Sequence, residues 1–192
     1  MSTAEKAGVR SRINELHRQL DPHSARSEAI AELDAMFGAG STPQPPPAGF
    51  KRGRLLTTSI TQSVDASARR IAGLWMPWLG KSFQPETQSG VNILTLSAVR
   101  PLNFLWPSYV PERETPDGIE VFPFRTRVAP GELDPGVDVL KIDYDFDANP
   151  DFIIRRILDE LVEVDAGFYL GKILYRWKGT FRLIGFFSLE SA

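Results

Sequence analysis

Three aspartates alternate with aromatic residues in the segment 143–147 (Asp-Tyr-Asp-Phe-Asp), and this spacing invites comparison with a calcium-binding loop. An EF-hand loop needs a glycine at its sixth position and a bidentate glutamate at its twelfth. Counted from Asp143, those positions hold Ala148 and Ile154, so the segment cannot wrap a calcium ion in that way. Alternation with period two is typical of a β-strand with one charged, solvent-facing side. We therefore predict a charged strand face and no metal site.

Two scarce residue types restrict the catalytic chemistry that the chain could perform. There is no cysteine, which excludes a thiolate nucleophile, a disulfide and Cys-ligated zinc. The two histidines, His17 and His23, both lie near the N-terminus, so the rest of the chain cannot hold a Ser-His-Asp triad or a multi-histidine metal site. A haem held by a proximal histidine is likewise unsupported. We expect no cofactor.

Cationic side chains in apolar surroundings are the main candidates to meet the polar end of a ligand. Lys81 follows two tryptophans, and Lys172 lies within an apolar segment. If Lys172 points inward, its ammonium needs a carboxylate or an anionic ligand head group. If it points outward, the side chain extends past apolar neighbours to water, which we favour. Arg125 and Arg127 could bind an anionic head group, although a salt-bridged strand face is favoured.

The aromatic residues are more numerous than one face of a small sheet needs, with 12 Phe and 4 Trp in the chain. A cavity for an apolar ligand would produce this pattern, and so would an ordinary packed core. Both interpretations stay open. The residues that we expect to line such a cavity or to meet its ligand are Trp75, Trp78, Lys81, Trp106, Phe124, Arg125, Tyr144, Tyr169, Lys172 and Trp177.

The elements that would position these side chains are clearest in the segment 137–190, which predicts a connected antiparallel β unit. Alternation over 140–147 predicts a strand, and 149–158 a short helix that begins with Asn149 and Pro150. Strands are expected over 168–177 and 181–189, joined by a tight turn at Lys178-Gly179. The last two strands are apolar on both faces, so both faces must be covered.

The preceding part of the chain divides into three stretches. Apolar spacing predicts helices over 3–21 and from Ser24 to Phe37, joined as an αα-hairpin. Residues 41–49 are a Pro-rich linker. Strands are expected at 54–60, 91–96 and 119–128, with an edge or bulge at Pro123, and a short helix after Ser63.

These elements predict an α+β fold that is mainly an antiparallel curved sheet or a small, calycin-like β-barrel. An N-terminal αα-hairpin (1–40), the linker (41–49) and a barrel-like body (50–192) make up the chain, with short inserted helices. The length of 192 residues suits one such domain with appendages.

Charge and hydropathy restrict the classes of partner that the sequence leads us to expect. With 22 basic and 24 acidic side chains, the formal charge is −2, which gives no general reason to expect nucleic acid or an anionic membrane as a partner. No uncharged apolar run approaches the roughly 18 residues of a spanning helix. The polar N-terminus does not resemble a signal peptide. We expect a cytoplasmic protein with no membrane span.

Several short segments together resemble a little-characterised bacterial group named for a GXWXG motif. The group has a leading helix, a Gly-rich first strand, a Gly-Lys-Phe-like element, an aspartate-tyrosine strand and a late hairpin. Lys51 stands where the motif has tryptophan. The resemblance implies a small β-barrel-like fold over about residues 30–190 and no particular activity. The counterparts in this chain are 49–53 (Gly-Phe-Lys-Arg-Gly), 80–83 (Gly-Lys-Ser-Phe), 141–145 (Lys-Ile-Asp-Tyr-Asp) and 169–172 (Tyr-Leu-Gly-Lys).

Three classes of function fit these observations. The first is a binding protein that encloses a lipophilic small molecule, such as a fatty acid or a polyketide- or terpenoid-like compound, with Lys81, Arg125 or Lys172 at its polar end. The alternative is a cyclase or isomerase that shapes an apolar substrate and uses one acid or base. Candidates for that group are Asp143, Tyr144, Tyr169 and Lys172. The third is an assembly role for the N-terminal helices, which leaves a homo-oligomer open.

Overall fold

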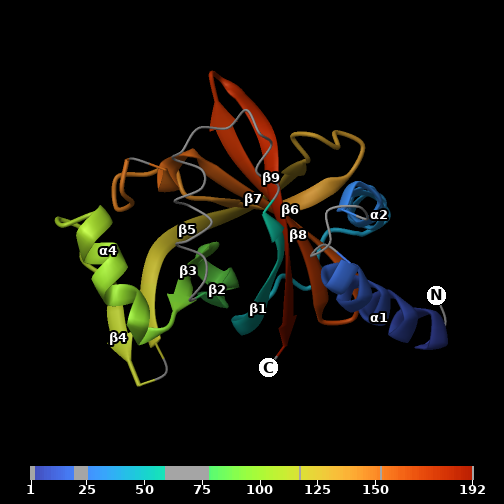
Figure 1. Cartoon of the computed structure of the whole chain (residues 1–192), viewed down its shortest axis with the longest axis horizontal. Coiled ribbons are helices and arrows are strands. Elements are labelled where there is room, and N and C mark those ends of the chain that lie inside the picture. Colours follow the sequence, from blue (N-terminus) through green and yellow to red (C-terminus); the bar gives the residue numbers. More distant parts are fainter. Residues whose placement is uncertain (1–2, 20–25, 59–77, 117, 152, 192) are drawn as a thin grey trace.

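The computed structural model describes residues 3–19, 26–58, 78–116, 118–151 and 153–191 (Figure 1). Within these ranges the chain is mostly β-structure. Trp75, the end of the strand expected at 54–60, the helix expected after Ser63 and the turn between the two N-terminal helices lie outside the described residues.

Eight strands close into an antiparallel barrel in which each strand pairs with the next along the chain. Pairing of β3 with β5 and of β1 with β9 closes the ring, and β4 (Arg113–Thr115) is appended to β5. The small antiparallel barrel expected from the sequence is therefore confirmed. The barrel strands are β1 (Gly49–Thr58), β2 (Trp78–Gln84), β3 (Ser89–Leu94), β5 (Gly118–Pro130), β6 (Asp138–Asp143), β7 (Ile157–Asp165), β8 (Phe168–Trp177) and β9 (Thr180–Ser191).

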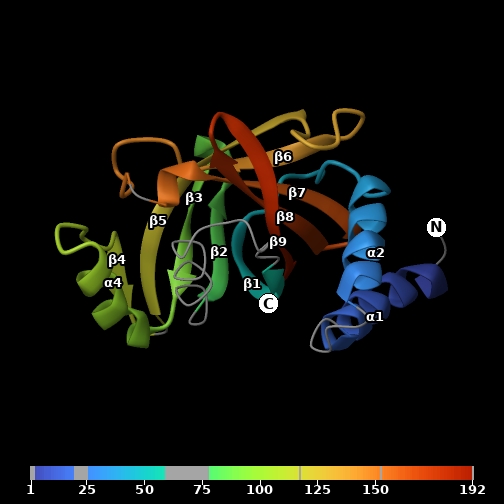
Figure 2. The same ribbon diagram turned by 45° about the horizontal axis from the view of Figure 1, so that its top comes forward.

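Helices cover the barrel from two sides. Helices α1 (Thr3–Gln19) and α2 (Arg26–Gly38) lie together on one side, and α4 (Val99–Leu105) lies with β4 on the other (Figures 1 and 2). Single 3₁₀ turns occur at Pro85–Thr87, Leu96–Ala98 and Ile154–Arg156. Among the described helices, none is long and apolar enough to cross a membrane.

Two separate apolar clusters explain why the last strands have apolar residues on both faces. Successive side chains of a strand point to opposite faces. In β8, Tyr169 and Ile173 belong to the cluster inside the barrel, whereas Phe168 and Leu170 belong to the cluster beneath the N-terminal helices. Phe37 of α2 is fully buried in that outer cluster. The barrel wall is thus packed from both sides here.

The 137–190 segment agrees with its prediction except between residues 144 and 165. Strands β8 and β9 and the turn between them are confirmed. The helix expected over 149–158 is wrong, because only one 3₁₀ turn forms and Ile157 and Leu158 begin β7, paired with β8. The strand expected over 140–147 ends at Asp143.

Elsewhere, the strands β2 and β4 were not predicted, and one irregularity was. Strand β2 has a positive-φ glycine, Gly80, with a bulge beside it. These irregularities interrupt the alternation of inward-facing and outward-facing residues by which a strand is recognised. The bulge expected at Pro123 is confirmed, because β3 pairs Gly90 with Phe124 and Asn92 with Val121. Two residues of β5 therefore face one residue of β3.

Candidate functional site

A buried ion pair crosses the barrel interior. Lys81 on β2 and Asp159 on β7 are both fully buried, and Lys81 Nζ lies 2.9 Å from Asp159 Oδ2. In the closed strand order, β2 and β7 are separated by the same number of strands in either direction, so they face each other across the barrel. The pair joins opposite walls.

Tyr144 and Asn92 complete this polar network. Lys81 Nζ donates to Tyr144 Oη at 2.5 Å and to Asn92 Oδ1 at 2.9 Å. Tyr144 Oη in turn donates to Asp159 Oδ2 at 2.9 Å. The Asn92 amide donates to the carbonyl of Phe122 at 3.1 Å, which holds its oxygen toward Lys81. Four strands or strand ends thereby converge on one ammonium group.

Four aromatic rings surround the same ammonium. Lys81 Nζ lies 5.2–5.5 Å from the ring centroids of Trp78, Phe124, Tyr144 and Phe187. Ring faces at this distance attract a cation, and more strongly where water is excluded. Part of the aromatic excess of the sequence thus forms a cage around one buried charge.

Burial changes the proton affinities within the network. Desolvation lowers the pKa of Lys81, while the charge of Asp159 and its hydrogen bond oppose that change. Desolvation, followed by the charge of Asp159, raises the pKa of the Tyr144 hydroxyl well above its ordinary value. Asp159 Oδ1 is buried and has no hydrogen-bond partner among the described residues. The interior therefore keeps one unused acceptor beside an ammonium and a phenol.

Trp78 links this network to a pocket on the barrel. Its indole N–H donates to Asn92 Oδ1 at 3.2 Å, and its ring packs edge-on against Phe187. The same ring lines a pocket of about 590 Å³, whose other described walls include Phe50, Leu79, Ile93, Arg52 and Glu120. Gly53 makes this placement possible, because a Cβ there would lie 2.4 Å from the Trp78 ring.

The structure brings together only part of the predicted site. The rings of Trp78, Phe124 and Tyr144 surround the Lys81 ammonium, and Phe124 packs against Tyr144. Trp106 and Tyr169 belong to the same interior cluster, and half-buried Trp177 packs against it. Arg125 is exposed on the surface, with its guanidinium 4.9 Å from the ring centroid of Phe146.

Lys172 lies on the opposite face of the barrel wall from Lys81. The favoured expectation of a solvated ammonium is wrong, because α2 and the loop before β6 cover it and leave 1% exposed. Its Nζ lies 2.6 Å from Asp34 and 2.6 Å from Asp134, and 4.5 Å from the Phe37 ring centroid. The buried ammonium thus has the carboxylate partners that the other alternative required.

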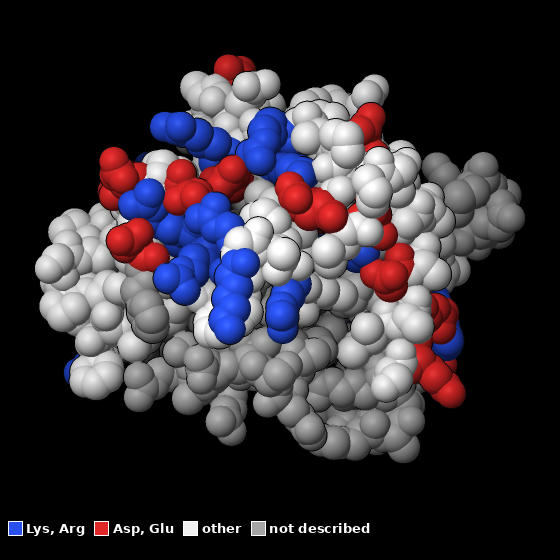
Figure 3. All heavy atoms as spheres, turned by 90° about the horizontal axis from the view of Figure 1, so that it is seen from above, with Lys and Arg blue, Asp and Glu red and all other residues white. Residues whose placement is uncertain are grey.

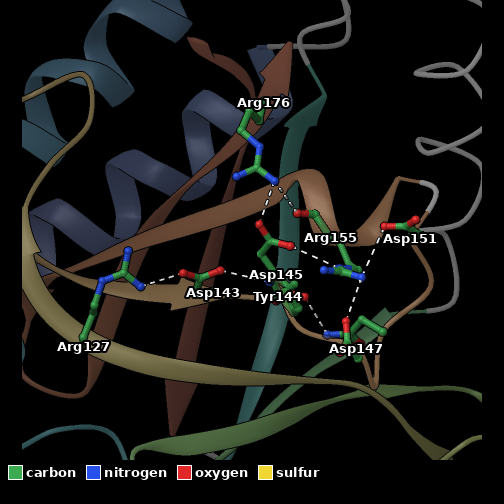
Figure 4. A network of polar contacts seen from close by, with 9 residues as sticks. Arg127, Asp143, Tyr144, Asp145, Asp147, Asp151, Arg155 and Arg176 are labelled. Atoms are coloured by element: carbon green, nitrogen blue, oxygen red, sulfur yellow. Dashed lines mark hydrogen bonds and ion pairs between the residues drawn. The ribbon is translucent and has the colours of Figure 1, made fainter. Parts of the chain in front are cut away.

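The acidic segment is held by arginines (Figure 4). Asp145 accepts hydrogen bonds from Arg155 at 3.1 Å and from Arg176 at 2.7 Å, and these bonds lower the pKa of its carboxyl. Arg127 donates to Asp143 at 2.7 Å. Figure 3, a view of the molecule from above, shows basic and acidic side chains intermingled over part of that face. The surface is a salt-bridged face, as the Arg127 pattern indicated.

Asn92 and Asp159 are the network residues that the sequence reasoning missed. Asp159 directly follows the segment 149–158 that was expected to be a helix, a position where an acid is usually solvated. If this segment is interpreted as a strand, Asp159 and Glu160 lie on opposite faces among apolar residues. That interpretation would have predicted that both acids are buried. Asn92 is a lone amide between Val91 and Ile93 in a strand that was expected, and that position was the available signal.

Comparisons with protein-family models and with curated proteins find no match. Among solved structures, a crystal structure of a protein from Thermomonospora curvata is similar over 95% of this chain and 99% of that chain. Its TM-score is 0.50 and its sequence identity is 16%. A likeness at this identity shows the fold alone.

Proposed function

We propose that the protein is a calycin-like binding protein for a lipophilic small molecule with an acidic end, held in the Trp78 pocket. The observation that carries the proposal is the composition of that pocket: apolar walls from Phe50, Trp78, Leu79 and Ile93 beside the guanidinium of Arg52. Its volume of about 590 Å³ lies within the range usual for ligand sites.

Arg52 is the best candidate to meet the ligand's acidic end. It has no ion pair among the described residues, whereas Glu120 in the same pocket is paired with Arg113. The three cations first considered are engaged elsewhere: Lys81 with Asp159, Lys172 with two aspartates, and Arg125 over an aromatic ring. A carboxylate in the pocket would therefore find Arg52 available.

The interior network serves this proposal by fixing the pocket wall. Trp78 is held by Asn92, and Asn92 by Lys81 and the Phe122 carbonyl. A wall whose orientation is set in advance loses little freedom when a ligand binds. Lys81 and Tyr144 come from two of the segments that resemble the GXWXG group, and we keep membership of that group as a hypothesis.

A displacement titration with a fluorescent fatty acid tests the proposal. We expect the fluorescent fatty acid to bind saturably. An unlabelled fatty acid and the fatty alcohol of equal chain length should both displace it, and the acid should have the higher affinity. Arg52→Met should weaken the acid about tenfold, the scale of one hydrogen bond to a charged group, and leave the alcohol unchanged. Arg54→Met, on the same strand but outside the pocket lining, is the matched control. Absence of saturable binding for both ligands refutes the proposal.

A second candidate is the cyclase or isomerase, and the Tyr144 hydroxyl favours it. A phenol bonded to both an ammonium and a carboxylate in an apolar interior is a set of groups that can move a proton. Incubation of a bound lipophile with the protein, followed by chromatography with mass detection, should then reveal an isomer of equal mass. Tyr144→Phe should abolish that product while binding persists. Equal conversion by the variant would contradict the role of Tyr144.

A further inference from the structure

The buried network places a lysine against an asparagine and an aspartate at once. Lys81 and Asn92 lie directly opposite each other on the neighbouring strands β2 and β3. Lys81 Nζ is 2.9 Å from Asn92 Oδ1 and 2.9 Å from Asp159 Oδ2. Because a carbonyl bond is about 1.2 Å long, the amide carbon Cγ of Asn92 lies within about 4 Å of Nζ. An amine, an amide carbon and a group that can take a proton are therefore adjacent.

These groups are shielded from water, which favours reaction between them. Lys81 and Asp159 are fully buried, and Asn92 is 2% exposed. Burial lowers the pKa of Lys81, so the uncharged, nucleophilic amine forms more easily than it would in water. Transfer of one proton from Lys81 to Asp159 also removes two charges from an interior in which isolated charges are costly. The fold holds the amine and the amide together, which replaces the cost of bringing two molecules into contact.

Trp78 and Tyr144 contact the two atoms of the Asn92 side chain whose charge would change. The indole N–H of Trp78 donates to Oδ1 at 3.2 Å, where it would stabilise negative charge that develops on this oxygen. Tyr144 Oη accepts from Nδ2 at 3.3 Å and donates to Asp159 Oδ2 at 2.9 Å. A continuous hydrogen-bonded path therefore connects Asp159, through Tyr144, with the nitrogen that would leave.

We propose that Lys81 and Asn92 form an intramolecular amide bond in the folded protein. Asp159 takes one proton from the Lys81 ammonium, and Nζ then forms a bond to Cγ of Asn92. The bond between Cγ and Nδ2 breaks as a second proton passes from Nζ by way of Asp159 and Tyr144 to Nδ2, which leaves as ammonia. The ammonia takes up the proton held by Asp159. Overall, an ammonium group and a primary amide give a secondary amide and one ammonium ion.

This covalent link does not depend on the proposed ligand. Folding must come first, because Asp159 reaches the other two groups only from the opposite barrel wall. Freshly folded protein therefore holds the free ion pair, and the linked form accumulates afterwards. The link joins β2 to β3 within the network that orients Trp78.

Mass spectrometry of the purified full chain tests the proposal. After several days at neutral pH, the intact mass should be lower by one ammonia molecule. Trypsin and a glutamate-specific protease then cut the chain, the latter after Glu86 in the turn between β2 and β3. The peptides that contain Lys81 and Asn92 should remain joined. Separate peptides overturn the proposal, even with ammonia lost, because asparagine can also release ammonia by closing to a succinimide. So does loss of water with Lys81 joined to Asp159.

Three variants identify the groups involved, while the wild-type result decides the proposal even if a variant fails to fold. Lys81→Arg keeps the positive charge without the nucleophilic amine and should abolish the link. Tyr144→Phe keeps the amine, the amide and the carboxylate but interrupts the proton path, and should slow linking about a hundredfold. Lys172→Arg, at the other buried lysine with carboxylate partners, is the matched control and should link as the wild type does. Joined peptides in Lys81→Arg, or an unchanged rate in Tyr144→Phe, would overturn the proposed reaction.

Discussion

Replacing Asp159 by asparagine tests whether the barrel interior is as dry as the structure indicates. The variant keeps the shape of the side chain and an oxygen to accept from Tyr144, but it leaves the Lys81 ammonium without a counter-charge. Both partners are fully buried, so solvent cannot replace the lost carboxylate. Breaking a buried pair in this way costs about 3–5 kcal/mol of unfolding free energy.

The cost should depend on pH in a defined direction. Burial already lowers the pKa of Lys81, and loss of Asp159 lowers it further because Asp159 was the opposing influence. The unfolded chain then binds one more proton than the folded chain between the two pKa values, so stability rises with pH across that window. The penalty of Asp159→Asn should be largest near neutral pH and shrink toward the ordinary pKa of lysine, about 10.4.

Urea or thermal unfolding measures the effect. For a chain of this length, 3–5 kcal/mol corresponds to a fall in Tm of about 6–20 °C. The double variant Lys81→Met with Asp159→Leu should recover most of that loss, because apolar groups of similar size fill the space without a charge. A penalty below about 1 kcal/mol, or one that does not change with pH, would refute the reasoning, since it would mean that water reaches the pair.

Three further changes have expected outcomes. Gly53→Ala should cost about 1–3 kcal/mol in a denaturant titration and shift the tryptophan emission, because the new Cβ would overlap the Trp78 ring. Glu160→Gln should raise Tm at pH 7 and lose that gain near pH 4, because burial raises the pKa of Glu160 and makes its ionisation costly as pH rises. Deleting residues 1–40 should lower Tm and, by light scattering, raise rather than lower the molar mass, because it exposes the outer cluster around Leu170 and Phe186.

Each of these has a result that would count against its premise. An unchanged emission spectrum in Gly53→Ala would mean that Trp78 moves aside without cost. A gain from Glu160→Gln that is equal at pH 4 and pH 7 would remove ionisation as its cause. A lower molar mass after deletion would show that the N-terminal helices hold copies of the chain together, the third class of function that the sequence left open.

The late hairpin was predictable because its alternation and turn are local signals. Tyr169 and Ile173 recur on one face and Lys178-Gly179 marks the turn, so no distant contact is needed to recognise β8 and β9. β7 was not recognised because its residues are apolar on both faces, and Ile153 with Ile157 imitates helical spacing. Only the closed barrel and the covering helices explain why both faces are buried.

The candidate site was predictable in its members but not in their roles. Lys81, Trp78, Phe124 and Tyr144 were singled out as an unusual aromatic and cationic set. The carboxylate that pairs with Lys81 comes from the opposite barrel wall. The local sequence of neither strand predicts that the two side chains meet. For the same reason, the sequence alone does not mark Arg52 as a binding residue, because the pocket that it lines is formed by several strands.

The pairing of β1 with β9 has a consequence for how the chain is made. Lys51 lies opposite Ser191, so the first strand of the barrel cannot be paired on that side until the distant β9 has been made. During synthesis from the N-terminus, at about 5–20 residues per second, β1 therefore leaves the ribosome seconds before β9 can cover it. Helix α2 also cannot complete its packing until β8 has been made, because its Asp34 pairs with Lys172 on that strand. The nascent chain should depend on protection of that open edge until β9 emerges, and its folding should be slow for its size.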